Sequence, residues 1–99
     1  MSTVISSIVQ PTTLIHGVKT VTTAGTEVAL TTSKNLKSGV TVKALQSNTG
    51  IIYVGLNPVT SLTGFQLTAS ESVFIEIHNS SLIYIDSSVS GEGVSYIGS

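Results

Sequence analysis

The hydrophobic and polar positions of this chain alternate with a period of two, most clearly in residues 72–78. One side of that segment carries Val73, Ile75 and Ile77. The other side carries Phe74, Glu76 and His78. Alternate side chains of a β-strand share one face of a sheet, so this pattern predicts a strand with one buried face.

Similar short segments recur at spacings near ten residues, separated by turns rich in Gly, Ser, Asn and Pro. The further predicted strands lie in residues 14–22, 28–30, 40–44, 51–55, 65–67, 82–86 and 94–98. The segment at 51–55, IIYVG, is apolar on both faces, which favours a central position in a sheet. No segment keeps a helical spacing of apolar residues over three turns, so no helix longer than one turn is predicted.

Seven or eight short strands without crossover helices predict an all-β domain that is mainly antiparallel. We expect a two-sheet β-sandwich over residues 14–99, with immunoglobulin-like or jelly-roll topology; a small barrel is the alternative. The last two strands, LIYID and VSYIG, are expected to be consecutive antiparallel strands of a closing hairpin. Asp86 and Glu92 would then guard the strand end and the turn against unwanted pairing.

Residues 1–13, MSTVISSIVQPTT, are predicted to form an extended N-terminal arm. They contain no charged side chain, and Pro11 interrupts them. The apolar residues of the arm are Val4, Ile5, Ile8 and Val9. Two interpretations remain open, a frayed end and a strand that lies on a neighbouring subunit.

The composition favours a protein that works within an assembly. The chain has 99 residues, and only 9% of them are charged, against roughly 25% in typical soluble domains. Copies with so little charge repel one another weakly. All four lysines lie in the first half and most acidic residues in the second, so the charges pair either within one domain or between neighbouring copies.

Several function classes are not expected. No apolar run approaches the ~20 residues of a membrane helix, and no basic patch with interleaved aromatic residues indicates nucleic-acid binding. The chain has no cysteine, and His16 and His78 fall on separate predicted strands, so no metal site is expected. Glu71 and Glu76 are expected on opposite faces, and no nucleophile or phosphate-loop motif is present. We therefore predict no catalysis and no cofactor.

The aromatic residues are the remaining candidates for a ligand site. They are Tyr53, Phe65, Phe74, Tyr84 and Tyr96. On one exposed face they could stack on a sugar, but core or subunit-interface packing is the preferred interpretation.

Three segments resemble a type of small protein encoded by tailed bacteriophages and prophages. They are NTG-x-x-YVG at residues 48–55, the turn at residues 70–73, and YID-x-SVSGEGVSY at residues 84–96. The resemblance covers about residues 18–98, and it implies an all-β structural protein of the virion without catalytic residues. Ala69 and Ser70 stand where such proteins often have a glycine before the glutamate.

The function expected from this resemblance is that of a capsid decoration or cement protein on the outer surface of the head. It would bind the major capsid protein across capsomer boundaries and associate with itself as a homotrimer. The expected interface residues are Val4, Ile5, Ile8, Val9, Phe74 and His78. The alternatives are a neck, tail or baseplate component, and a carbohydrate-binding module that recognises the host surface.

Overall fold

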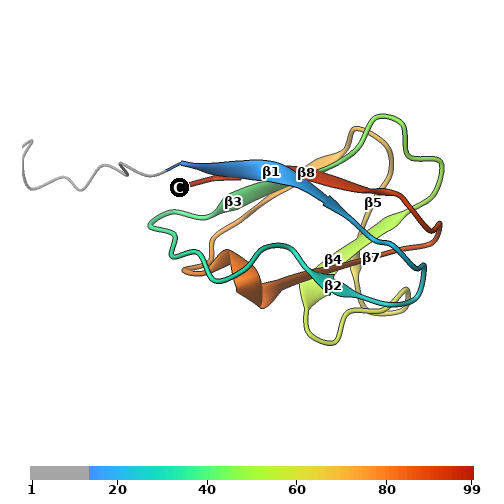
Figure 1. The fold of residues 1–99 in the computed structure, drawn as a ribbon, viewed down its shortest axis with the longest axis horizontal. Coiled ribbons are helices and arrows are strands. Elements are labelled where there is room, and N and C mark those ends of the chain that lie inside the picture. Colours follow the sequence, from blue (N-terminus) through green and yellow to red (C-terminus); the bar gives the residue numbers. More distant parts are fainter. Residues whose placement is uncertain (1–13) are drawn as a thin grey trace, which may run out of the picture.

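A computed structural model describes residues 14–99 as eight strands and one short 3-10 helix (Figure 1). The strands are β1 (Ile15–Thr20), β2 (Val28–Ala29), β3 (Val40–Ala44), β4 (Ile52–Leu56), β5 (Phe65–Leu67), β6 (Ser72–Ile75), β7 (Ile83–Ser87) and β8 (Gly93–Gly98). The helix is η1 (Ser80–Leu82). The predicted arm, with its four apolar residues, lies outside the described residues.

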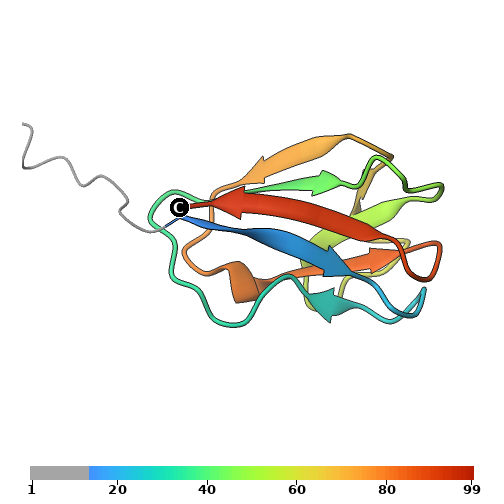
Figure 2. The same ribbon diagram turned by 45° about the horizontal axis from the view of Figure 1, so that its top comes forward.

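The strands form two antiparallel sheets of four strands each. Sheet A has the order β1-β8-β3-β6, and sheet B has the order β2-β7-β4-β5. Figure 2 shows the strands of sheet A side by side, with β6 at the top and β1 below β8. The predicted two-sheet β-sandwich is confirmed, and the IIYVG segment takes its expected central place as β4.

The strand order decides between the two topologies that the sequence left open. In an immunoglobulin-like domain the first two strands share a sheet. Here β1 and β2 lie in different sheets, and β1 pairs with β8. Eight strands in the orders 1-8-3-6 and 2-7-4-5 form a jelly roll.

The expected closing hairpin is wrong. β7 pairs with β2 and β4 in sheet B, whereas β8 pairs with β1 and β3 in sheet A. The Ser/Gly-rich connection therefore crosses from one sheet to the other. Two apolar strands joined by a turn can pair with each other or pack face to face, and their local sequence is the same in both cases.

The core lies between the inward faces of the two sheets. Val40, Val42 and Ala44 of β3 are fully buried opposite Ile83 and Ile85 of β7. The alternation predicted in residues 72–78 is confirmed, because its apolar face packs against the core and its other face is exposed. The two halves of the chain interleave in both sheets, as expected if their charges mix within one domain.

The outer face of sheet B is covered by the chain's own loops. Tyr53 points outward from β4 yet is only 7% exposed, because the 57–64 loop folds over it. Val59 of this loop is buried, and its N–H donates to a carboxylate oxygen of Glu27 at 3.0 Å. Gly64 makes this approach possible, since a Cβ atom there would meet the Tyr53 side chain and lie 2.9 Å from a methyl group of Val59.

The turn between β5 and β6 places a serine in a conformation that favours glycine. Ser70 has a φ of +68°, and its N–H donates to the Ala44 carbonyl at 3.0 Å. Glu71 closes the turn, with its side chain accepting from the Thr68 N–H at 2.8 Å. A left-handed conformation strains any residue with a Cβ atom.

Replacing Ser70 with glycine is therefore expected to stabilise the protein. We expect Ser70→Gly to raise the free energy of unfolding by about 0.5–1 kcal/mol, since the relief of strain exceeds the added flexibility of the unfolded chain. Urea denaturation measures this change. Ser61→Gly in the exposed 57–64 loop is the control and should lower stability slightly. Equal losses in both variants would contradict the argument.

Candidate functional site

The outer face of sheet A is open to solvent and carries large apolar side chains. One row across the sheet runs through His16 of β1, Ile97 of β8, Thr41 of β3 and Phe74 of β6, each opposite the next. Ile97 is 51% exposed and Phe74 56%. Within residues 14–99, no loop covers this face as the 57–64 loop covers sheet B, so these apolar side chains stay open to solvent.

A second row of this face runs through Val18, Ser95, Lys43 and Ser72. Val18 is 62% exposed. Between the two rows lies a shallow hollow of about 580 Å³, lined by side chains of β1, β3, β6 and β8.

Both described residues of the predicted interface lie on the exposed side of their segment, but in different surroundings. Phe74 projects from β6 into the first row, next to Thr41. His78 lies beyond the end of β6, and its carbonyl accepts from the Leu36 N–H at 2.7 Å. His78 is therefore placed at one end of the sandwich rather than in the rows of the outer face.

Three exposed apolar residues of this surface were absent from the predicted interface: Leu14, Val18 and Ile97. The sequence contains a signal for two of them, Leu14 and Val18. Residues 14–22 carry apolar side chains at both even and odd positions, so both faces of this strand are partly apolar. Only the structure shows which of those faces the core takes up.

Two of the segments that carry the phage resemblance form one contact at the far end of the sandwich, which we call the loop clasp. It consists of Asn48, Thr49 and Gly50 with Glu92 and Gly93. The Glu92 carboxylate accepts from the backbone N–H groups of Thr49 at 2.6 Å and Gly50 at 2.8 Å. The buried Asn48 amide donates to the Gly93 carbonyl at 2.8 Å. The clasp holds the β3–β4 and β7–β8 connections together, so Glu92 has a structural role within the domain rather than that of an exposed guard.

These hydrogen bonds make the loop clasp sensitive to pH. The backbone N–H groups of Thr49 and Gly50 stabilise the carboxylate and hold the pKa of Glu92 below its ordinary value. A carboxyl group with a lowered pKa in the folded state stabilises the fold at neutral pH. That contribution is lost as pH falls below about 4 and through the folded-state pKa.

We expect Glu92→Gln to destabilise the protein at neutral pH and to have a smaller effect near pH 3, because that pH lies below the unfolded-state pKa and part of the carboxylate's contribution is already lost there. Urea denaturation of both proteins at the two pH values gives the difference in unfolding free energy. Glu76→Gln, on the exposed face of its segment, controls for the removal of a charge. A difference of the same size at both pH values would show that the clasp does not depend on the ionised carboxylate.

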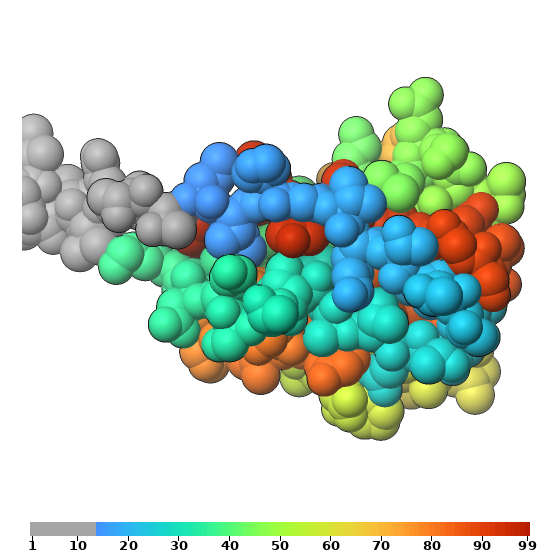
Figure 3. Space-filling model, in the orientation of Figure 1, coloured from blue at the N-terminus to red at the C-terminus, as the bar shows by residue number. Residues whose placement is uncertain are grey.

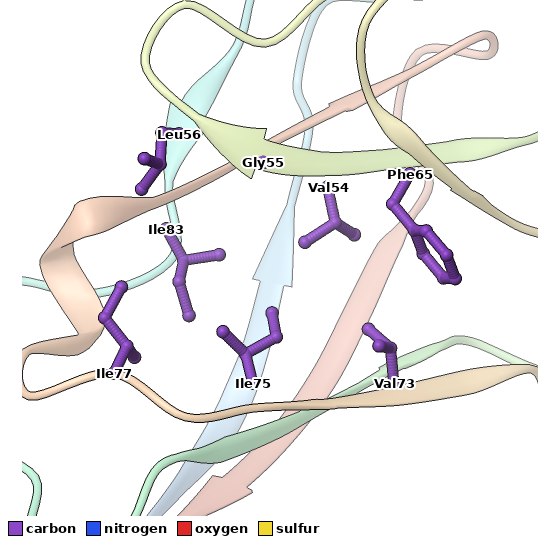
Figure 4. Close-up of a pocket in the computed structure, with 8 residues that line it drawn as sticks. All are labelled: Val54, Gly55, Leu56, Phe65, Val73, Ile75, Ile77 and Ile83. Carbon is purple, nitrogen blue, oxygen red and sulfur yellow. The ribbon is translucent and has the colours of Figure 1, made fainter.

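An apolar groove opens between the two sheets, on the side where β5 and β6 are the edge strands. Its volume is about 250 Å³. Figure 4 shows side chains from the two sheets facing each other across it, with Ile83 between Leu56 and Ile77. Val54 and Phe65 line the side of sheet B, opposite Val73 and Ile75 from β6. No charged side chain lines the groove among the residues that the structure describes.

On the opposite side of the sandwich, β1 and the segment that leads to β3 cover the space between the sheets. Figure 3 shows β1 in blue above the teal segment that leads to β3, with part of β8 in red visible between them. Tyr96 packs against the core on this side, and its ring occupies the space next to Gly17. The apolar opening therefore belongs to the β5 and β6 edge.

The five aromatic side chains do not share one exposed face. Tyr96 packs against the core and Tyr53 lies under a loop. Phe74 is on the outer face of sheet A, whereas Phe65 lies at the groove. A sugar-stacking platform needs neighbouring exposed rings, so these residues give the carbohydrate-binding alternative no support.

The charged groups form no recognisable catalytic arrangement. His16 and the segment of His78 lie at opposite edges of sheet A, because β1 and β6 are its edge strands. Within residues 14–99, no three His, Cys, Asp or Glu side chains come together as metal ligands. The same residues contain no helix with the length and apolar character to cross a membrane. The absence of catalysis stays a prediction.

Comparisons with protein-family models, with curated proteins and with solved structures found no match to this chain.

Proposed function

We propose that this protein is a structural component of a phage virion, a capsid decoration protein that binds the outside of the head through the outer face of sheet A. The observation that carries the proposal is the contrast between the two outer faces. Loops cover one of them, and the other exposes Val18, Phe74 and Ile97 on three of its four strands. A protein that worked alone in solution would gain little from such a surface.

Two further observations support this function. Residues 18–98 resemble small structural proteins of tailed phages, and the jelly roll is common in viral capsid domains, although lectin domains share it. The mechanism is additive. Each copy buries a modest apolar area at about 25 cal/mol per Å², and many copies on one shell together resist its expansion.

The test compares phage heads with and without the protein. Heads that lack it should break at lower temperature or under milder osmotic shock, and added full-length protein should restore their resistance. Normal heads combined with lost tails or lost infectivity would contradict decoration and indicate the neck, tail or baseplate alternative.

The binding surface is tested on the same heads by co-sedimentation. Phe74→Asp and Ile97→Asp should each weaken binding at least tenfold, because each places a charge in a surface that must lose water. Leu62→Asp is the matched control, since Leu62 is 93% exposed and lies in the 57–64 loop on the other sheet. Equal binding of all three variants would rule out the outer face of sheet A as the contact.

A further inference from the structure

The apolar groove has two properties that suit it to bind an extended segment, its lining and its borders. Its lining is almost entirely aliphatic, and its borders, β5 and β6, are edge strands that pair on one side only with the strands of residues 14–99. β5 is only three residues long and pairs with β4 no further than Val54. Such an edge can accept one more extended segment, with backbone hydrogen bonds for affinity and apolar side chains for the groove.

The chain contains one segment with matching chemistry, residues 4–9 in the sequence VISSIV. It has no charged side chain to leave unpaired in an apolar groove, and no proline to remove a backbone donor. In an extended conformation Val4 and Ile8 would share one face, as would Ile5 and Val9. Either face presents two aliphatic side chains about 13 Å apart.

The length of the arm allows it to reach the groove of another copy. Leu14 precedes β1, at one edge of sheet A, whereas the groove borders β6 at the other edge. Ile15, Gly98, Val40 and Ile75 lie in one row, so three strand spacings of about 4.8 Å separate the arm's origin from the groove. Thirteen extended residues span up to about 43 Å, enough to cross to a neighbour.

We propose that the groove between β4, β5 and β6 binds residues 4–9 of the arm of a second copy of this chain. Leu14 lies next to β1 and the groove beside β6, at opposite edges of sheet A, so the contact closes either by reciprocal exchange between two copies or as a ring when the rotation allows. This inference does not rest on capsid binding, since it concerns the isolated protein.

The first test is the oligomeric state of the full chain and its variants by size-exclusion chromatography with light scattering. The full chain should form a small closed oligomer. Leu56→Asp at the rim of the groove, and Ile5→Asp with Ile8→Asp in the arm, should each raise its dissociation constant at least tenfold. Leu62→Asp, the same change at an exposed site away from the groove, should leave it unchanged. A monomeric full chain, or an oligomer that survives both changes, would overturn the proposal.

The second test identifies the contact directly and does not depend on how well the aspartate variants fold. The chain has no cysteine, so single cysteines can be placed without background. Mixing the Ile8→Cys protein with the Leu56→Cys protein under mild oxidation should give a cross-linked heterodimer. Val18→Cys in place of Leu56→Cys is the control and should give little product. If the double variant Ile8→Cys with Leu56→Cys cross-links only within one chain, the arm binds its own groove and the proposal is wrong.

Discussion

Gly93→Ala is expected to lower the free energy of unfolding by about 3 kcal/mol. Gly93 begins β8 opposite Thr20 of β1, and a Cβ atom there would collide with the Lys19 carbonyl and lie 2.9 Å from the Cα of Thr20. These are backbone atoms of a paired strand, so they cannot rotate away. The strand would have to move, and the Asn48 contact in the loop clasp would weaken with it.

The measurement is urea denaturation, with Gly25→Ala as the matched control. A Cβ atom at Gly25 has no neighbour within 4 Å, and the cost there comes only from its φ of +88°, about 1 kcal/mol. Equal losses at the two positions would show that β1 and β8 separate more easily than their contact implies.

Asp86→Ala is expected to cost about 2–3 kcal/mol, because it removes a buried carboxylate and leaves two backbone donors, one of them buried, without an acceptor. Asp86 is 4% exposed. One of its carboxylate oxygens accepts from the Gly25 N–H at 2.9 Å and the Ser87 N–H at 2.7 Å. The bond from Gly25 fastens the 21–27 loop over the outer face of sheet B.

Thermal and urea unfolding should give Asp86→Asn an intermediate loss, because the amide keeps one oxygen acceptor. Glu76→Ala removes a carboxylate from an exposed position and should change stability by less than about 0.5 kcal/mol. If Asp86→Ala also changes stability by less than about 0.5 kcal/mol, then water replaces the carboxylate at Gly25 and Ser87.

Asp86 also shows where interpretation of the sequence was wrong. Asp86 was expected to guard the end of its strand against unwanted pairing. It is instead 4% exposed, because the 21–27 loop, sixty-one positions away at Gly25, returns to cover it. A period of two assigns residues to faces but does not say what covers each face.

The candidate site was predictable only in part. Phe74 follows from the alternation of its own strand, which places it on the face opposite Val73 and Ile75, both partly buried against the core. Val18 and Ile97 come from strands that are far apart in sequence, and the outer face of sheet A exists only because β8 pairs with β1 and β3. The groove likewise needs β4, β5 and β6 in place before its walls face each other.

The sequence by itself determined the all-β class, the approximate position of each strand and the inward face of most of them. These properties follow from the local alternation of apolar and polar residues and from the residues that favour turns. The tertiary structure alone decided the jelly-roll order, the separation of β7 and β8 into different sheets, and the contact between Glu92 and the loop at Asn48. The physical reason is that backbone hydrogen bonds between strands are alike for every sequence, so the partner of a strand is selected by how the whole core packs.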